Sequence, residues 1–291
     1  MKHFLTFILK ILLVTFAVFV VLDFLYANIY MQSYNRGKID NVYYSAARNY
    51  DVVILGSSRA SNHFVAPMFE EKGLRTYNYG MCGSHLFEAS LMLKLMLERN
   101  YKIKNIILEA DLNLSNEQQA DAISAHFLPY LHYSEIIKKH FSRERNFAFV
   151  YYLPFYRFAA FESRIGFREM IFSLIHKKSK ALENSGYEPL PNDSKGNMKN
   201  SIVGLRPLQN KYYEEIKQIC KANNIRLISV MTPMCSNVKG MEYFHKVKAL
   251  YPEIHNYEKV VQEDDCFSSC GHMNDKGARI FTAKVIKDFF N

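Results

Sequence analysis

The sequence predicts an α/β fold, a doubly wound parallel sheet with helices on both faces, preceded by one transmembrane helix. Three observations predict it: an almost continuously apolar N-terminal segment, short β-branched runs further along, and amphipathic segments that alternate with those runs. The chain has 291 residues, of which 49% are hydrophobic and 22% charged. This composition is typical of a chain that buries a core, and excludes disorder over most of its length.

The transmembrane helix is predicted from residues 4–22, which are apolar except for Lys10. A helix rises about 1.5 Å per residue, so about 20 residues cross a hydrocarbon core of about 30 Å. The apolar run ends at Asp23 and its flanks without the small residues of a signal-peptide cleavage site. We therefore expect an uncleaved anchor, with its flanks, over residues 1–30.

The orientation of this anchor is predicted from the flanking positive charges. Lys2 and Lys10 favour a cytoplasmic N-terminus, whereas Arg36 and Lys38 favour the opposite orientation. No second span follows, so the remaining chain is expected on one side of the membrane. We expect a single-pass protein of the cytoplasmic (inner) membrane whose main domain is periplasmic or otherwise extracytoplasmic.

Residues 31–50 are polar and are expected to form a stalk, and residues 51–56 begin the α/β domain. The sequence Asp-Val-Val-Ile-Leu-Gly of residues 51–56 is short, β-branched and ends in glycine, which is typical of a strand buried on both faces. Further strands are predicted over residues 76–80, 104–109 and 225–231. Helices are predicted over residues 60–72, 85–99, 208–222 and 276–290.

Two stretches interrupt this alternation within the domain expected over residues 51–291. Residues 141–175 are rich in Phe and Tyr and are expected to form a helical insertion. Core packing is the favoured interpretation of these aromatic residues, and contact with a substrate or a membrane is the alternative. Residues 177–206 contain several Gly and Pro among polar residues, and predict a long, mobile surface loop.

The net charge of +9 at pH 7 fits a nucleic acid, an anionic membrane surface or an anionic polymer as partner. The basic residues are scattered apart from a cluster at residues 176–180, and neither a zinc-finger spacing nor a recognition helix accompanies them. We expect solvated surface charge near an anionic envelope, and no nucleic acid as partner.

The candidate chemistry lies after the first predicted strand and before the last predicted helix. In doubly wound folds the ligand binds at the carboxyl ends of the strands. Ser57 and Ser58 follow the first strand, where a tight turn exposes a hydroxyl beside backbone N–H groups; a structural helix cap is the alternative. His272 precedes the final helix, from where it is expected to reach the serine and act as a general base.

Three blocks carry a family resemblance: residues 54–59 (Ile-Leu-Gly-Ser-Ser-Arg), 77–84 (Tyr-Asn-Tyr-Gly-Met-Cys-Gly-Ser) and 271–278 (Gly-His-Met-Asn-Asp-Lys-Gly-Ala). In these blocks and their order the chain resembles the SGNH or GDSL-type hydrolases. It resembles in particular their membrane-anchored extracytoplasmic branch, which includes proteins of alginate and peptidoglycan O-acetylation and the D-alanyl transfer protein of teichoic acid assembly. The resemblance implies an SGNH-like, flavodoxin-like fold.

The resemblance also implies roles for individual residues. Ser58 falls on the nucleophile and His272 on the general base, and the N–H groups of Ser58 and Gly80 fall on the oxyanion hole. These roles fit acyl transfer, because a base must take the serine proton and fixed donors must stabilise the tetrahedral oxyanion.

The chain departs from the family pattern at two positions. The family's acid stands three residues before the histidine, where this chain has Ser269. Asp265 or Asp264 is expected to orient His272 from a shifted loop, unless a Ser–His dyad suffices. The family's third block supplies an Asn to the oxyanion hole, and the Asn expected in that role here, Asn113, is displaced along the chain.

The five cysteines are too few for a disulfide scaffold. Cys266 and Cys270 leave two interpretations open, a disulfide between them in an oxidising compartment or two unpaired thiols. Cys82 is expected to be a small packed residue rather than a nucleophile. A metal site on these cysteines and the nearby histidine lacks a fourth ligand at a usual spacing, so no metal is expected. Glu109 and Asp111 are not expected to form a carboxylate pair, and without a Gly-rich phosphate loop no cofactor is expected.

The sequence thus predicts a membrane-anchored serine esterase or O-acyltransferase that acts on acyl esters of a cell-envelope glycan or a lipid-linked saccharide. The membrane is a partner, and the resemblance implies a membrane acyltransferase as another. The alternative is a non-catalytic scaffold or binding component of an envelope polysaccharide assembly or export complex. The absence of an aspartate at position 269 favours this alternative.

Overall fold

The computed structural model describes residues 1–192 and 196–290 and divides into two compact units. Unit 1 comprises residues 1–44 and 121–178, and unit 2 comprises residues 45–120 and 179–291. This division differs from the expected one, in which residues 51–291 form one domain. The helical insertion begins near residue 121 and belongs to the same unit as the N-terminal segment.

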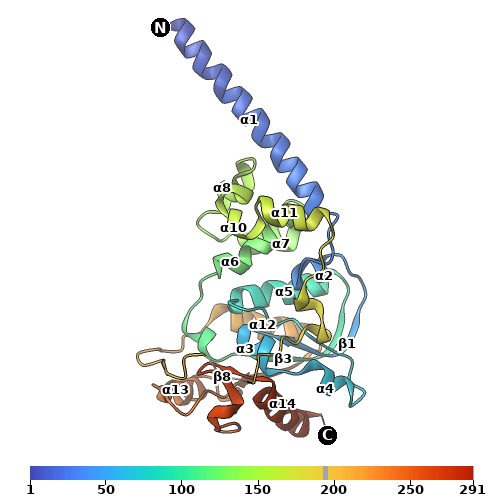
Figure 1. The fold of residues 1–291 in the computed structure, drawn as a ribbon, viewed down its shortest axis with the longest axis vertical. Coiled ribbons are helices and arrows are strands. Elements are labelled where there is room, and N and C mark those ends of the chain that lie inside the picture. Colours follow the sequence, from blue (N-terminus) through green and yellow to red (C-terminus); the bar gives the residue numbers. More distant parts are fainter. Residues whose placement is uncertain (193–195, 291) are drawn as a thin grey trace. The chain divides into compact units, whose positions relative to one another are not determined.

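Unit 1 begins with α1 (Lys2–Tyr30), a helix of 29 residues that is long and apolar enough to cross a membrane. Its most apolar 18-residue window has a mean hydropathy of 2.8 and is not buried by the protein. Only near its C-terminal end are side chains buried, at Ala27 and Tyr30. The expected N-terminal apolar helix is confirmed (Figure 1).

The rest of unit 1 is built of short helices. These are α2 (Lys38–Tyr43), α6 (Asp121–Ser124), η2 (Ala125–Tyr130), α7 (Glu135–Phe141), α8 (Phe147–Tyr152), α9 (Tyr156–Ala160), α10 (Glu162–Ile165) and α11 (Phe167–Leu174). Within residues 31–50, which were expected to form a stalk, α2 buries Ile39 and Val42 in this unit. Aromatic rings join distant segments, as in the stacked pairs Tyr43–Tyr130 and Tyr30–Phe158.

Unit 2 is organised around a five-stranded sheet. Its strands are β1 (Asn49–Leu55), β2 (Thr76–Asn78), β3 (Lys102–Glu109), β5 (Arg226–Met231) and β7 (His255–Asn256). They lie in the order β2-β1-β3-β5-β7 and neighbouring strands run parallel. Counted along the chain this order is 2-1-3-4-5, one of the doubly wound arrangements, which places its switch point between β1 and β3.

Helices flank the sheet (Figure 1). They are α3 (Ser58–His63), α4 (Ala66–Glu70), α5 (Leu86–Glu98), α12 (Lys211–Ala222), α13 (Glu242–Leu250) and α14 (Asp275–Phe289). Val52 and Ile54 of β1 share one apolar core with residues of α3, α4 and α14. Because alternate strand residues point to opposite faces, the buried Val53 and Leu55 face the other side, where α5 and α12 pack together.

Smaller elements complete unit 2. They are η1 (Leu112–Ser115), η3 (Lys180–Leu182), η4 (Asn184–Gly186), η5 (Asp264–Cys266), the parallel pair β4 (Asn200–Ser201) and β6 (Val238–Lys239), and the antiparallel pair β8 (Phe267–Ser269) and β9 (His272–Met273). The loop expected over 177–206 is partly outside the described residues. In its described part Tyr187 and Ile202 are buried, so this segment packs on unit 2 rather than extending from it.

The cysteines pair differently from either expectation. The disulfide joins Cys235 and Cys270, whose Cα atoms lie 4.7 Å apart, and Cys266 is a buried free thiol. The extended strand β8 separates Cys266 from Cys270, since an extended chain advances about 3.3 Å per residue. The disulfide therefore links the segment after β5 to the turn that precedes His272.

Candidate functional site

The structure brings Ser58 and His272 together at the carboxyl ends of the strands. Ser58 is the first residue of α3, directly after the turn that follows β1, and His272 lies in β9 before α14. The Ser58 Oγ lies 2.8 Å from the His272 Nε2, across a sequence separation of 214 residues. Ser57 is the residue that caps α3, accepting a hydrogen bond from the Arg59 N–H, so the neighbouring Ser58 hydroxyl does not serve as the cap.

The second ring nitrogen of His272 faces a hydroxyl. Its Nδ1 lies 3.3 Å from the Oγ of Ser269, three residues earlier in the chain. A neutral imidazole carries one N–H. With that proton on Nδ1, Nδ1–H donates to Ser269 and Nε2 accepts the proton of Ser58. Burial and the Arg59 guanidinium lower the pKa of His272 below its ordinary value, which keeps the ring neutral and able to accept a proton near pH 7.

The carboxylates expected to orient His272 lie elsewhere. Asp265 forms an ion pair with Lys276 at 2.6 Å and its side chain is 68% exposed. Asp264 accepts a hydrogen bond from Ser236. The short helix η5 turns both carboxylates to the surface, while β8 carries Ser269 to the ring. The expectation for Asp265 is therefore corrected: within the described residues the site is a Ser–His dyad with a hydroxyl at Nδ1.

The N–H of Gly80, expected in the oxyanion hole, has an acceptor two residues earlier in the chain. This N–H donates to the Asn78 Oδ1 at 2.9 Å. Close packing explains why residue 80 is a glycine, because a Cβ there would lie 2.5 Å from the backbone nitrogen of Ser61 in α3. The N–H of Ser58 belongs to the first residue of a helix, a position without an intrahelical acceptor.

Asn113 also falls away from the expected position. It lies in η1, and its carbonyl accepts a hydrogen bond from the Asn210 side chain at 3.3 Å. Asp111, not Asn113, stands at the end of β3 beside the turn after β1. The expectation that Asn113 joins the oxyanion hole is thus corrected, because η1 begins after Asp111 and turns the chain away.

Ser58 and His272 open into a cavity of about 750 Å³. Its other lining residues are Asn62, Cys82, Leu190, Pro191, Gly196, Ser268 and Ser269. Cys82 was expected to be packed, yet it is exposed and lines this cavity. Leu190 and Pro191 were not anticipated from the sequence. The sequence signal that could have identified them is an apolar residue next to a proline within the otherwise polar loop of residues 177–206.

A buried pair of carboxylates lies behind the dyad, contrary to expectation. Glu109 and Asp111 are both fully buried. The Glu109 Oε2 accepts hydrogen bonds from the N–H and the Oγ of Ser57, at 2.8 and 2.7 Å. The Asp111 Oδ2 accepts from the Arg59 Nε at 3.0 Å and from the Thr232 N–H at 3.1 Å. The sequence signal was the spacing of Glu109 and Asp111, since residues two apart in an extended chain point to the same side.

The two carboxyls have opposite pKa shifts. Burial and the neighbouring Asp111 charge raise the pKa of Glu109 to about 8. Burial also acts to raise the pKa of Asp111, but the Arg59 guanidinium and the hydrogen bonds to its oxygens hold it below the ordinary value. At neutral pH a protonated Glu109 therefore lies beside an ionised Asp111.

This pair predicts a pH dependence of stability. The folded protein holds a proton on Glu109 up to about pH 8, whereas the unfolded chain releases it near its ordinary pKa of about 4.3. The free energy of unfolding should therefore fall between about pH 4.3 and pH 8, by at most about 1.4 kcal/mol per pH unit. Glu109→Gln should flatten this slope in urea denaturation at pH 5, 6.5 and 8. The exposed Glu71→Gln serves as control, and equal slopes in both variants would contradict the prediction.

Arg59 joins three segments of the site, a role that the sequence did not reveal. Besides Asp111, its Nη1 donates to the Gly271 carbonyl at 2.9 Å and its Nη2 to the Thr232 carbonyl at 2.7 Å. His63 adds a further link, since its Nε2 accepts from the Met273 N–H at 3.0 Å. These bonds hold the turn and strand that carry His272 against the ends of β3 and β5.

Comparison with models of known protein families and with curated protein sequences finds no match to this chain. Among the described residues, no group of three or more His, Cys, Asp or Glu side chains could hold a metal ion.

Proposed function

We propose that the chain is a membrane-anchored serine esterase or O-acyltransferase of the SGNH type, acting on acyl esters of a cell-envelope glycan. The observation that carries this proposal is the 2.8 Å contact between the Ser58 Oγ and the His272 Nε2. A serine hydroxyl is a weak nucleophile until a base takes its proton, and a neutral imidazole at hydrogen-bond distance is such a base.

In the proposed reaction the Ser58 Oγ attacks the acyl carbonyl carbon while its proton passes to the His272 Nε2. The N–H of Ser58 donates to the oxyanion of the tetrahedral intermediate. When the intermediate collapses, the bond to the leaving oxygen breaks and the imidazolium gives that oxygen its proton, which leaves the acyl group on Ser58. Water or an acceptor hydroxyl then attacks this ester, passes its proton to His272, and Ser58 regains a proton as it leaves.

Two features of the geometry predict slow turnover. A hydroxyl stabilises the imidazolium less than a carboxylate does, and replacing the acid of a triad with an amide costs about 10⁴-fold in kcat. The Gly80 N–H is engaged by Asn78. The same two features favour the second candidate, a non-catalytic scaffold or binding component of an envelope polysaccharide complex, which retains the fold with little or no turnover.

Membrane anchoring and the glycan substrate have different support. The length and apolarity of α1 support a single membrane crossing. The extracytoplasmic location, the glycan or lipid-linked saccharide and a membrane acyltransferase as partner are proposed from the resemblance of residues 54–59, 77–84 and 271–278 to the SGNH branch.

Hydrolysis of p-nitrophenyl acetate by the full chain in detergent micelles tests the catalytic proposal. We expect Ser58→Ala to lower kcat/KM by at least about 10²-fold, because no other group replaces the attacking oxygen. Ser142→Ala, which removes an exposed hydroxyl in unit 1, should retain the wild-type rate. Equal turnover by the wild type and Ser58→Ala would leave the scaffold as the better account.

A further inference from the structure

Large apolar and aromatic side chains are exposed on two segments of unit 1. One is the α8–α9 segment (residues 147–160) and the other is α11 with its C-cap. Their exposed fractions are 53% for Phe149, 70% for Tyr152, 47% for Leu153, 38% for Tyr156, 61% for Phe167, 52% for Leu174 and 63% for Ile175. A water-soluble surface seldom gathers so many, and such a surface indicates a partner or a membrane.

The exposed residues of α11 lie on one face of that helix. Phe167, Leu174 and Ile175 have the spacing i, i+7 and i+8, so their side chains project from the same side. Met170 and Ser173 are the buried residues of this helix. An amphipathic helix whose apolar face is turned to the solvent is typical of a helix that lies in a membrane interface.

The α8–α9 segment contacts α1 where its apolar run ends. The Phe155 ring lies 6.1 Å from the ring of Phe19 and 5.0 Å from the ring of Tyr26. At about 1.5 Å per residue, Phe19 lies about 4.5 Å before Leu22, the last residue of the run, and Tyr26 lies about 6 Å beyond it. Phe155 therefore lies at the level of α1 where its apolar run ends.

Polar bonds hold the segment against this part of α1. Asp23 accepts a hydrogen bond from the Phe155 N–H at 3.0 Å and pairs with the Arg157 Nη2 at 2.9 Å. Phe155 has a φ of +64°, in the left-handed region that non-glycine residues seldom adopt. The ion pair also neutralises Asp23, the acidic residue that follows the apolar run.

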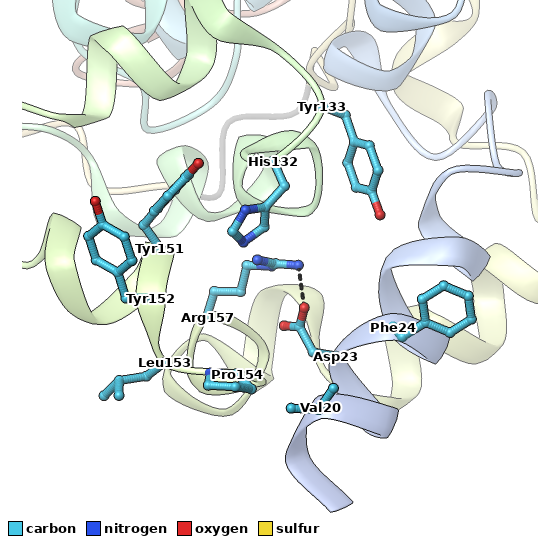
Figure 2. Close-up of a pocket in the computed structure, with 10 residues that line it drawn as sticks. All are labelled: Val20, Asp23, Phe24, His132, Tyr133, Tyr151, Tyr152, Leu153, Pro154 and Arg157. Atoms are coloured by element: carbon cyan, nitrogen blue, oxygen red, sulfur yellow. Dashed lines mark hydrogen bonds and ion pairs between the residues drawn. The ribbon is translucent and has the colours of Figure 1, made fainter. Parts of the chain in front are cut away.

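The cavity around this pair has one apolar and one polar end. It has a volume of about 340 Å³, and its lining residues are labelled in Figure 2. In that view Val20, Leu153 and Pro154 lie on one side of the Asp23–Arg157 pair, and the polar rings of His132 and Tyr133 lie on the other. Val20 precedes Asp23 in α1, so the apolar end faces the membrane-crossing part of the helix.

We infer that the α8–α9 segment and the exposed face of α11 lie in the interface of the bilayer that α1 crosses, with the lipid as their partner. Phe155 of the α8–α9 segment contacts Phe19, which is itself exposed in the apolar run of α1, and this argues for lipid rather than a second protein as the occupant. Tyr152 and Tyr156 are suited to the boundary between hydrocarbon and water, and Lys177 and Lys178 after α11 are suited to anionic headgroups. The inference rests on the membrane crossing in the proposed function and is independent of the chemistry of Ser58.

Tryptophan fluorescence in bilayers tests this inference, because the chain contains no tryptophan. Leu153→Trp and Ile175→Trp each place one indole on the proposed surface of the full chain. Val14→Trp places it in α1, and Val203→Trp at a comparably exposed apolar position of unit 2. Each variant is reconstituted into phosphatidylcholine–phosphatidylglycerol vesicles with and without brominated acyl chains.

We expect brominated lipid to quench Leu153→Trp and Ile175→Trp at least about twofold more than Val203→Trp, with a blue-shifted emission. Blue-shifted emission without quenching would show that protein, not lipid, covers the surface. Water-like emission without quenching would show that nothing covers it, and either result overturns the inference. Val14→Trp is the control for insertion of α1. If brominated lipid quenches Val14→Trp, α1 is in the bilayer and a lack of quenching at the two positions on the proposed surface contradicts the inference; if it does not, α1 itself has not inserted.

Discussion

Replacement of His272 by Gln is expected to lower kcat/KM for p-nitrophenyl acetate by about 10²–10⁴-fold, the range for loss of a general base. The amide fills a similar space but does not accept a proton from the Ser58 Oγ, which lies 2.8 Å from the ring nitrogen in the wild type. The full chain is assayed in detergent micelles between pH 5 and pH 8. Because the pKa of His272 lies below its ordinary value of about 6.5, the pH at which the wild-type rate is half-maximal should lie below about 6.5.

His245→Gln is the matched control for this prediction. His245 lies exposed on α13 of the same unit. Its replacement changes the same side chain outside the site and should leave kcat/KM at the wild-type value. Equal rates for His272→Gln and His245→Gln would show that the imidazole at Ser58 takes no part in turnover.

Replacement of Arg59 by Ala is expected to lower the free energy of unfolding by about 3–5 kcal/mol, the cost of leaving a buried charge without its partner. The side chains of Arg59 and Asp111 are only 4% and 0% exposed, and the guanidinium also donates to the carbonyls of Gly271 and Thr232. Urea denaturation of the full chain, monitored by circular dichroism, measures the loss.

Arg279→Ala provides the comparison, because Arg279 forms an ion pair with Asp275 at 2.8 Å whose side chains are 53% and 30% exposed. An exposed pair contributes about 0–1 kcal/mol. A double variant, Arg59→Ala with Asp111→Asn, should recover part of the loss because it removes the unpaired charge. Similar losses for Arg59→Ala and Arg279→Ala would contradict the role assigned to Arg59.

The sheet could be predicted because its central strands carry a local signal. Val52 to Leu55 are buried on both faces of β1, and such a strand is apolar at every position instead of alternating. β7 has no such signal, since this strand is only two residues long and both of them, His255 and Asn256, are polar and exposed. Its place at the sheet edge comes from parallel pairing with Val230 and Met231 of β5, a tertiary contact.

The two-unit division depends on contacts that sequence spacing does not encode. The rings of Tyr26 and Tyr30, near the C-terminal end of α1, pack on Phe158 of the helical insertion. That packing joins the C-terminal end of α1 to residues 121–178 and leaves the sheet to a separate unit.

Residues of the candidate site were predictable where the end of a strand or the start of the final helix determines their position. They were not predictable where a side chain has several possible hydrogen-bond or ion-pair partners. The approach of Ser58 to His272 followed from the end of β1 and the start of α14. The pairing of Asp111 with Arg59, across 52 residues, did not. Asp265 is near His272 in sequence, yet its carboxylate pairs with Lys276 at the surface, where its charge stays solvated.

Covalent labelling of the full chain with a fluorophosphonate, followed by peptide mass spectrometry, tests the nucleophilic role of Ser58 most directly. We predict one adduct, on the Ser58 Oγ, that disappears in Ser58→Ala and becomes much weaker in His272→Gln. An unmodified Ser58, under conditions that label a known serine hydrolase completely, would contradict this prediction.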